Sequence, residues 1–378
     1  MKWTDIQKLV PAPGKAPDFQ ACLAAFPALE LAKLAPQNPE HHAEGNVWIH
    51  TMLVVEALVA MPAYALLSRR DQEIVFLAAL LHDIAKYSTT KVDPVTGAIS
   101  QPGHSQKGAV DVRIALWDAG APFDVREAIC RLIAVHQVPF FAVKGSRSGK
   151  TPEFIVRELS WHLDIPLLAM LAEADIRGRI CADREAILDR IEAFRDQARK
   201  EDCFGKPRHF ADAHTRLSYF RGANVHPDYA LYQEAGSQVT MMSGLQAVGK
   251  NTWVAKNAPG LPVVSFDDAL AQLGLRHGKN DGKAAHLAVD LARELLRKKA
   301  PFVWNATHLS PMMRKKTLDL LLKYNAEVRI VYLEQPRDVI MRRNTRRDTT
   351  LTNKGIEKML FHWEVPLPTE AHSVTYLA

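Results

Sequence analysis

The chain has 378 residues, 47% of them hydrophobic, which is enough for about two domains with packed cores. No apolar run reaches the ~18–20 residues that a membrane-spanning helix needs, and the N-terminal stretch lacks the apolar segment of a signal peptide. The four cysteines are scattered without a CxxC pair, which argues against a disulfide framework or a zinc–cysteine site. We therefore expect a cytoplasmic protein with reduced thiols and no membrane partner.

The net charge of +6 is unevenly distributed along the chain. Residues 237–378 contain 21 Lys and Arg against 13 Asp and Glu, whereas residues 1–236 contain 27 against 29. We expect the C-terminal part to attract polyanions more strongly. Either ATP alone or a nucleic acid strand accounts for such a preference.

Residues 1–200 are predicted to form an all-α domain. Apolar residues recur at helical spacing in the segments 48–67, 72–87, 106–118, 124–136, 152–161, 166–177 and 184–199. Loops rich in helix breakers, such as VDPVTGAISQPGH, separate these segments, and no strand is expected among them. Residues 201–236 have no clear period and are predicted to be a connector with a helical piece or two.

Residues 237–378 are predicted to form an α/β domain. Short apolar runs occur at 239–243, 262–266, 301–305, 327–333 and 373–377. Helical patterns lie between or after them, at 250–256, 281–299, 311–324, 336–346 and 353–362. This alternation indicates a mostly parallel sheet with helices on both faces.

The strongest pattern in the first half is LLHDIAKY, which contains His82 and Asp83. A His–Asp pair inside an apolar helix is costly unless it binds something. Lys86 follows His82 by four residues and is expected on nearly the same helix face. Taken alone, the pair fits a satisfied core pair as well as it fits a ligand site.

Further ligand types lie on other predicted helices, namely His50, His104, His136 and Asp175. Nitrogen and carboxylate ligands from several helices indicate a site for Mn, Fe, Ni, Co or Zn rather than for Ca. Two metals bridged by one carboxylate would activate water and hold a phosphoester oxygen. The set therefore favours metal-dependent hydrolysis over a core pair.

This set resembles that of the HD phosphohydrolase superfamily, whose fold is all-helical and whose members act on phosphoesters. The stretch HHAEGNVWIHT also resembles the opening helix of the HD domains attached to tRNA nucleotidyltransferases. The resemblance implies that one metal is held by His50, His82, Asp83 and Asp175. It also implies that Asp83 bridges to a second metal, which His104 and His136 help to hold.

Other polar side chains near these motifs receive different expectations. Lys86 and Arg179 are candidates for phosphate contact, and Arg179 lies four residues after Asp175. Glu44 is expected to be a solvated loop carboxylate, with assistance at the site as the alternative. The remaining histidines, including His41, His42 and His162, are expected to be surface or structural residues.

The second half contains GLQAVGKNTW at residues 244–253. It is close to the phosphate-loop pattern G-x-x-x-x-G-K-[ST], with Asn251 in the Ser/Thr position. Gly244 and Gly249 permit unusual backbone angles, and Lys250 is expected to reach the β and γ phosphates. The Asn251 carbonyl oxygen is an acceptable magnesium ligand. Thr252 is among the expected nucleotide-binding residues. Because it follows Asn251 by one residue, its side chain is expected to point in a different direction. The other interpretation is an ordinary glycine-containing turn.

Charged residues follow two later elements of this domain. Asp267 and Asp268 come directly after the predicted strand 262–266, where a carboxylate can accept a proton from an attacking hydroxyl. The run MRRNTRRD supplies arginines that can cover a γ-phosphate. The alternatives are a helix N-cap for one of the aspartates and a solvated helix face for the arginines.

These motifs resemble the kinase module of 5′-OH polynucleotide kinases, whose phosphate loop reads close to GxPGSGKSTW. The resemblance implies that Asp267 is the general base and that Arg343 and Arg347 of the RNxxR motif bind phosphate. WNATHL also resembles a strand-end motif of these kinases. Two departures from the pattern bear on the chemistry: Asn251 replaces the magnesium-binding Ser, and Leu270 stands where the phage enzyme has an arginine.

Taken together, the halves resemble the bacterial HD-domain polynucleotide kinases, which heal RNA ends. The resemblance implies hydrolysis of 2′,3′-cyclic phosphate or 3′-phosphate ends in the first half and phosphorylation of 5′-OH ends in the second. It implies ATP or another NTP with Mg²⁺ in the kinase site and one or two transition metals in the HD site. The partners would be RNA or DNA strand ends and a ligase.

Two alternatives remain open from the sequence. One is a small-molecule kinase, acting on nucleosides or nucleotides, that is fused to an HD nucleotide phosphohydrolase. The other is a nucleotide-sensing regulator with an inactive HD domain, against which the full ligand set argues.

Overall fold

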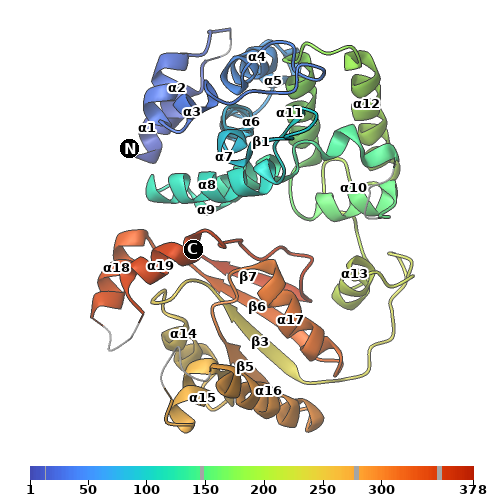
Figure 1. The fold of residues 1–378 in the computed structure, drawn as a ribbon. Helices are drawn as coiled ribbons and strands as arrows, with labels where there is room; N and C mark the ends of the chain where they lie inside the picture. The colour runs from blue at the N-terminus through green and yellow to red at the C-terminus, as the bar shows by residue number, and fades with distance from the viewer. Residues whose placement is uncertain (13, 145–148, 276–280, 347–350) are drawn as a thin grey trace. The chain divides into compact units, whose positions relative to one another are not determined.

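The computed structural model describes residues 1–378 except 13, 145–148, 276–280 and 347–350. The chain forms two compact units, Met1–Arg208 and His209–Ala378 (Figure 1). The division falls inside the predicted connector 201–236, where helix α13 (Ala213–Phe220) belongs to the second unit. None of the helices in the described part of the chain combines the length and apolar character needed to cross a membrane.

The first unit is helical, as predicted. Its α-helices are α1 (Trp3–Ile6), α2 (Phe19–Ala25), α3 (Leu29–Ala32), α4 (Val47–Val59), α5 (Pro62–Ala65), α6 (Arg69–Leu81), α7 (Lys86–Thr89), α8 (His104–Asp118), α9 (Phe123–Val135), α10 (Pro152–Ser160), α11 (Ile165–Arg177) and α12 (Arg184–Lys200). Short 3₁₀ turns lie at Gln7–Leu9, Val138–Phe140 and Ala142–Lys144.

Helix α6 lies at the centre of this unit. Residues 74–81 are all buried, which is typical of a helix that is surrounded by others on every side. Helices α4, α9 and α11 pack against it. Because α6 is covered on all sides, polar groups at its C-terminal end are also removed from water.

Two of the expected helices are interrupted. The segment 48–67 forms α4 and α5, because Pro62 has no N–H to donate and holds the preceding Met61 in an extended conformation. The segment 72–87 ends as α6 at Leu81, with His82 as its C-cap, and Lys86 begins α7. The expectation that His82 and Asp83 lie inside a helix is therefore wrong, since they occupy the turn that follows it.

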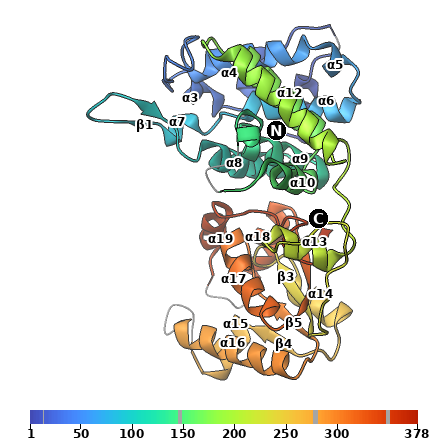
Figure 2. The same ribbon diagram turned by 90° about the vertical axis from the view of Figure 1, so that its right-hand side faces the viewer.

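A two-stranded antiparallel hairpin was not predicted for this unit. It pairs β1 (Lys91–Val92) with β2 (Ile99–Ser100), and the Asp93 carboxylate accepts hydrogen bonds from the Val95 and Thr96 amides in its turn. The hairpin extends away from the helices and most of its residues are exposed (Figure 2). With one face uncovered, it lacks the apolar alternation by which a strand is recognised in a sequence.

The second unit contains a five-stranded sheet in the order β4-β5-β3-β6-β7, and every neighbouring pair is parallel. The strands are β3 (Gln238–Ser243), β4 (Val263–Ser265), β5 (Phe302–Asn305), β6 (Glu327–Leu333) and β7 (Ser373–Leu377). All five predicted strands are therefore present. The fold class, an all-α unit followed by an α/β unit with a parallel sheet, is confirmed.

The helices of the second unit also follow the prediction closely. After α13 they are α14 (Lys250–Asn257), α15 (Phe266–Gln272), α16 (Asp281–Arg297), α17 (Pro311–Leu322), α18 (Arg337–Thr345) and α19 (Asn353–Leu360). Helix α15 was not predicted, because its seven residues are too few for a clear helical period. Helix α14 packs against β5, α16 against β4 and α17 against β6.

The strand order determines where a ligand site can form. Strands β4, β5 and β3 are consecutive neighbours, so their carboxyl ends meet along one edge of the sheet. Ligands of open parallel sheets bind at that edge. The phosphate loop after β3, Asn305 at the end of β5 and Asp267 after β4 all follow these ends.

Candidate active sites

The first candidate site is a cluster of histidines and aspartates within the helical unit. It contains six predicted metal ligands at the ends of different helices, all buried: His50, His82, Asp83, His104, His136 and Asp175. His82 and His136 are the C-caps of α6 and α9, and His104 is the first residue of α8. The predicted ligand set is therefore brought together in one place.

Asp83 lies at the centre of this cluster. Its Oδ2 is 3.1 Å from His82 Nε2 and 3.7 Å from His50 Nε2. Its Oδ1 is 3.4 Å from His104 Nε2 and 3.9 Å from His136 Nε2. Two ligands on one ion with bonds of about 2.1 Å lie roughly 3.0–3.4 Å apart. Each oxygen therefore faces a different pair of histidines, and the nearer histidine of each pair, His82 or His104, has the spacing of two ligands on one ion.

Backbone carbonyls fix the orientation of three of these imidazole rings. His82, His104 and His136 each place Nδ1 2.8 Å from a carbonyl oxygen of their own helix end or turn, at Ala79, Gln101 and Ile133. A ring that donates from Nδ1 presents an unprotonated Nε2. In the neutral form that metal binding requires, the three Nε2 atoms therefore face the cluster as electron-pair donors.

The unsatisfied atoms of the cluster test whether a metal ion fits. Among the described residues, His82 Nε2, His136 Nε2 and Asp83 Oδ1 are buried without a hydrogen-bond partner, whereas Asp83 Oδ2 has the Lys86 ammonium group 2.7 Å away. Each such atom costs free energy unless something replaces its lost water. Nitrogen and carboxylate donors in this number suit divalent transition metals, so the residues fit the predicted ions.

Neighbouring charges keep the carboxylates of the cluster ionised. Burial opposes the charge of Asp83, but His82 and Lys86 outweigh it and hold its pKa well below the usual range. Burial likewise opposes the charge of Asp175, and Arg179 outweighs it, so the pKa of Asp175 is also well below the usual range. Both groups are therefore available as anionic ligands at neutral pH.

The structure places Lys86 and Arg179 against these carboxylates. Lys86 Nζ lies 2.7 Å from Asp83 Oδ2 and donates to Gln37 Oε1 at 2.8 Å. Arg179 donates from two nitrogens to the two oxygens of Asp175, both at 2.9 Å. Both cations are buried, and their contact with a phosphate stays a prediction.

Gly178 explains how Arg179 and Asp175 remain on one side of α11. A Cβ at Gly178 would lie 2.6 Å from the backbone nitrogen of Val54, so only glycine permits this close approach to α4. Gly178 is the C-cap of α11 and retains a helical conformation. The side chain of Arg179 consequently turns back toward Asp175, four residues earlier.

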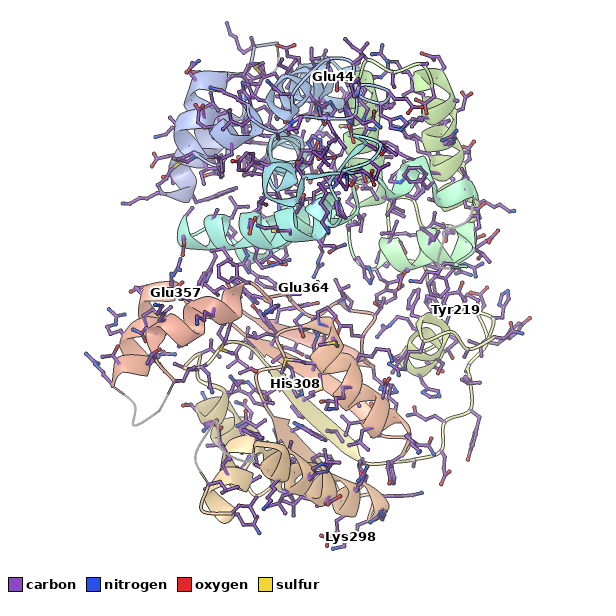
Figure 3. All side chains as sticks on the ribbon, viewed as in Figure 1. Glu44, Tyr219, Lys298, His308, Glu357 and Glu364 are labelled. Atoms are coloured by element: carbon purple, nitrogen blue, oxygen red, sulfur yellow. The ribbon has the colours of Figure 1, made fainter. Side chains whose placement is uncertain are left out.

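The prediction that Glu44 is a solvated carboxylate is wrong. Its side chain is 1% exposed and lies in the helical unit, where Figure 3 labels it. Its Oε1 is 2.8 Å from His42 Nδ1 and 2.9 Å from His50 Nδ1, and its Oε2 accepts from the Ile180 amide at 2.9 Å. His42 is also buried and forms a possible metal-binding group with Glu44 and His50. No local sequence pattern marks Glu44, because Ile180 is distant in the sequence.

The second candidate site is the phosphate loop between β3 and α14. Gly244 has φ 137° and Gly249 has φ 108°, conformations that side-chain-bearing residues rarely adopt. A Cβ at Gly244 would also lie 2.3 Å from the carbonyl oxygen of Leu333. The loop ends at Gly249, the N-cap of α14, so backbone N–H groups and the positive helix end face an anion there.

Two predicted cationic residues contact this loop. Lys250 is 7% exposed, and its Nζ donates to the carbonyl oxygens of Gly244 at 3.0 Å and Leu245 at 2.8 Å. Arg343, from α18, donates to the carbonyl oxygen of Val248 at 3.3 Å. The loop, Lys250 and Arg343 are therefore together, while Arg347 lies outside the described residues.

Asn251 and Asn305 form the polar wall next to the loop. Asn305 Nδ2 donates to Asn251 Oδ1 at 2.8 Å, which leaves Asn305 Oδ1 buried and without a hydrogen bond in the described structure. Amide oxygens are suitable ligands for Mg²⁺, so these side chains fit that ion. Asn305 was not among the predicted site residues. Thr252 is exposed on α14, and its part in nucleotide binding stays a prediction.

Asp267 and Asp268 are exposed in the first turn of α15, immediately after β4. The interpretation that one of them caps this helix is wrong. The N-cap is Ser265, whose side chain accepts a hydrogen bond from the Asp268 amide at 3.0 Å. Leu270 is 4% exposed and packs in the core, so this position supplies no substrate contact in place of arginine.

Two matches to known protein families fall one in each of the two units of the chain. Residues 47–169 match the family model described as HD domain, and residues 239–366 match the one described as AAA domain. A CC-adding tRNA nucleotidyltransferase of Thermus thermophilus is 33% identical over 111 residues, which cover 29% of this chain and 24% of that protein. The chain thus spans about a quarter of the length of this curated relative.

Solved structures include a gluconokinase from Sinorhizobium meliloti 1021, with 16% identity and a TM-score of 0.27. The match covers 39% of this chain and 85% of that one, and so low a TM-score does not establish a shared fold. The two family matches and the geometry of the two sites lead to one conclusion. This chain joins an HD domain to a P-loop kinase-like domain.

Proposed function

We propose that the protein heals broken nucleic acid strands. The HD domain hydrolyses 2′,3′-cyclic phosphate or 3′-phosphate ends, and the P-loop domain transfers phosphate from ATP or another NTP to 5′-OH ends. The products are 3′-OH and 5′-phosphate ends, which are the substrates of a ligase. A ligase is therefore the partner that acts next.

The kinase half of the proposal rests on positioning and charge. Lys250 and Arg343 contact the phosphate loop and supply cations for the donor phosphates, with Arg347 as the second lid residue by resemblance. Asn251 and Asn305 would hold Mg²⁺, which, when bound, neutralises charge on the donor phosphates. Asp267 accepts the proton of the attacking 5′-OH.

The HD half rests on the buried cluster. The residues that would hold two divalent ions are arranged around Asp83, and those ions, when bound, lower the pKa of a water molecule. Lys86 and Arg179 keep Asp83 and Asp175 anionic and in place. His42 and Glu44 hold the ring of His50 from its other side.

One observation favours a strand end over a small molecule as the kinase substrate. Asp267 and Asp268 are exposed at the edge of the sheet, next to the end of β5. An exposed base is accessible to the end of a long polymer. The excess of Lys and Arg in residues 237–378 attracts such a polyanion.

One assay tests both halves. An RNA oligonucleotide with a 5′-OH and a 2′,3′-cyclic phosphate is incubated with the protein, ATP, Mg²⁺ and Mn²⁺, and the product masses are measured. We expect gain of a 5′-phosphate and loss of the 3′-terminal phosphate. If neither end changes while nucleosides or mononucleotides are turned over, the protein is a small-molecule kinase and phosphohydrolase instead.

A further inference from the structure

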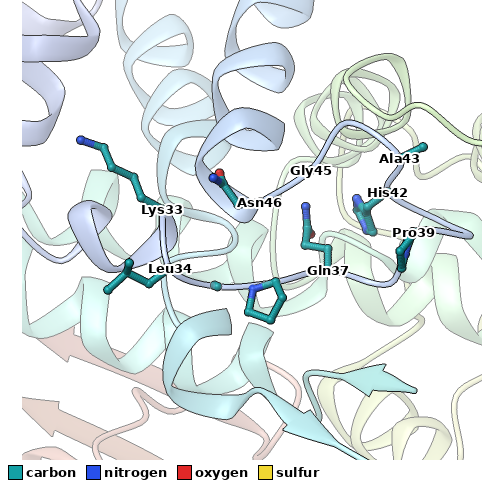
Figure 4. A pocket seen from close by; sticks show the side chains of 10 residues that line it. Lys33, Leu34, Gln37, Pro39, His42, Ala43, Gly45 and Asn46 are labelled. Atoms are coloured by element: carbon teal, nitrogen blue, oxygen red, sulfur yellow. The ribbon is translucent and has the colours of Figure 1, made fainter. Parts of the chain in front are cut away.

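A pocket lies beside the cluster of predicted metal ligands in the HD domain. Its volume is about 470 Å³, and the segment between α3 and α4 provides most of its lining, including Gln37, His42 and Ala43 (Figure 4). Ligand pockets typically have volumes of roughly 300–1,000 Å³. The space is therefore sufficient for one nucleotide.

Three contacts connect the pocket wall to the predicted metal ligands. Gln37 accepts a hydrogen bond from Lys86, which lies 2.7 Å from Asp83. His42 contacts Glu44, which also lies against His50. Gln37 and His42, which line the pocket, are therefore each one residue away from a predicted metal ligand.

A third contact joins the pocket wall to His104, one of the two histidines that face Asp83 Oδ1. The Gln101 side chain donates to the carbonyl oxygen of Pro36, a lining residue, at 3.1 Å. The backbone carbonyl of the same Gln101 lies 2.8 Å from His104 Nδ1. The residues that line the pocket are thus connected, through Lys86, Glu44 and Gln101, to the predicted ligands around Asp83.

Gln37 has a hydrogen-bond donor that no described residue accepts. The side chain of Gln37 is 5% exposed, and its Nε2 is buried without a partner among the described residues. The amide cannot be reversed, because Lys86 Nζ has only donors and must face the oxygen. A buried N–H₂ group without an acceptor is costly, so an acceptor from a ligand would satisfy it.

We infer that this pocket binds the terminal nucleotide of the strand whose phosphate is hydrolysed, with Gln37 Nε2 donating to an oxygen or nitrogen acceptor of that nucleotide. This inference rests on the proposed HD activity and names its specificity residue. Leu34, Pro36 and Ala43 supply apolar surface for a sugar and base. Gln37 has two functions: its oxygen holds Lys86, and its nitrogen recognises the substrate.

Two variants separate these functions of Gln37. Gln37→Glu keeps an oxygen for Lys86 and removes the donor, whereas Gln37→Leu removes both. The readout is the ratio of kcat/KM for a nucleoside 2′,3′-cyclic phosphate to that for p-nitrophenyl phosphate, which has no nucleoside. We expect Gln37→Glu to lower this ratio about tenfold, the value of roughly one hydrogen bond, mainly through KM. An unchanged ratio would mean that Gln37 acts only through Lys86 and would overturn the inference.

Direct binding provides a test that does not depend on turnover. Titration calorimetry compares adenosine 3′-monophosphate with inorganic phosphate on the full-length, Mn²⁺-loaded protein, with the kinase site saturated by a non-hydrolysable ATP analogue. Ala43→Phe fills the pocket at an exposed lining residue, and Ala65→Phe, exposed on α5, is the matched control. We expect Ala43→Phe alone to weaken nucleotide binding about tenfold or more while phosphate binding is retained.

Equal nucleotide affinities in the two alanine variants would overturn the pocket assignment. Nucleotide that binds no more tightly than phosphate to the unmodified protein would overturn it as well. Failure of the proposed end-healing function gives a different result. In that case the unmodified protein leaves RNA ends unchanged, yet nucleotide binding is still weakened by Ala43→Phe.

Discussion

At the scale of single residues, two neighbouring aspartates at the kinase edge differ in their local contacts. The backbone amide of Asp268 belongs to the cap of α15, because it donates to Ser265 Oγ. Asp267 precedes it in the same first turn and is the residue that the resemblance to 5′-OH polynucleotide kinases assigns as the base. The side chain of Asp267, rather than that of Asp268, is therefore expected to accept the substrate proton.

Asp267→Asn should lower kcat for 5′-OH phosphorylation about 10²–10⁴-fold, the usual contribution of a general base. Asp268→Asn keeps its amide bond to Ser265 and should change kcat only a few-fold. Radiolabel transfer from ATP to an oligonucleotide measures both variants. If Asp268→Asn abolishes transfer while Asp267→Asn retains it, the two roles must be exchanged.

His308 is a second residue whose surroundings lead to a measurable effect. It follows β5, and Figure 3 labels it within the second unit. Its Nδ1 lies 2.8 Å from the carbonyl oxygen of Met242 and its Nε2 3.0 Å from Thr317 Oγ1. Burial lowers the pKa of His308 to about 4. The ring is therefore neutral in the folded protein at physiological pH.

This lowered pKa makes the stability of the second unit depend on pH. An unfolded histidine has a pKa of about 6.5, so below that pH the unfolded chain takes up a proton that the folded chain does not. The stabilisation is complete above pH ~6.5, decreases as the pH falls, and levels off below the folded pKa of about 4. At pH 5 the loss from this one residue is about 2 kcal/mol.

Urea unfolding at pH 7.5 and pH 5.0 measures this loss. His308→Gln should reduce the difference in unfolding free energy between the two pH values by about 2 kcal/mol. Burial also lowers the pKa of His372 to about 4, but that residue contributes equally to both proteins. The same pH dependence in both proteins would show that His308 does not titrate in this way.

At the scale of elements, α18 presents two adjacent arginines in different surroundings. Arg343 reaches the carbonyl oxygen of Val248 in the phosphate loop, whereas Arg342 Nη2 lies 3.4 Å from Asp338 on its own helix. Asn344 fixes the end of α18 by donating to Leu351 and Asn353 at the start of α19. The helix is thus held so that one arginine faces the loop.

Arg343→Ala should therefore lower kinase kcat/KM by on the order of 10²-fold, the cost of removing one charge-stabilising donor. Arg342→Ala, on the same helix, should remain within a few-fold of the unmodified protein. Initial rates at several ATP concentrations separate effects on KM from effects on kcat. Equal losses in the two variants would indicate a general effect on α18 rather than a role for Arg343.

The elements of the second unit were largely predictable from the sequence, for a physical reason. Strands such as β5 are buried along most of their length, so their apolar runs are continuous, and the backbone angles at Gly244 and Gly249 are ones that few other residues adopt. The interruption of the helical unit at His82 was not predictable in the same way. Residues 74–81 are apolar throughout, and their pattern does not show where the helix stops.

The candidate sites show a similar contrast. The grouping of these side chains around Asp83 was predictable, because histidine and aspartate in apolar helical segments are rare without a partner. Glu44 and Gln37 were missed, because their significance depends on His50, Ile180 and Lys86, which only the folded chain brings near them. Asn305 was left out of the predicted site because its pairing with Asn251 joins the end of β5 to the start of α14, which are distant in the sequence.

At the scale of the whole molecule, each active site is built from residues of one unit. The cluster around Asp83 uses residues of Met1–Arg208, and the phosphate loop with its surroundings uses residues of His209–Ala378. Each unit also has its own hydrophobic core. Single substitutions in one site should therefore leave the chemistry of the other site intact.

Lys250→Ala removes the loop cation and should abolish 5′-OH phosphorylation while 3′-end hydrolysis is retained. His82→Ala removes a ligand from the cluster and should have the opposite effect, because His82 Nε2 is one of the atoms that face Asp83. The doubly modified RNA oligonucleotide reports both reactions in a single mass spectrum. Mixing the two variants should then restore complete healing, since each supplies the site that the other lacks. Loss of both reactions in either variant, with the circular dichroism spectrum unchanged, would indicate that the two units share one composite site.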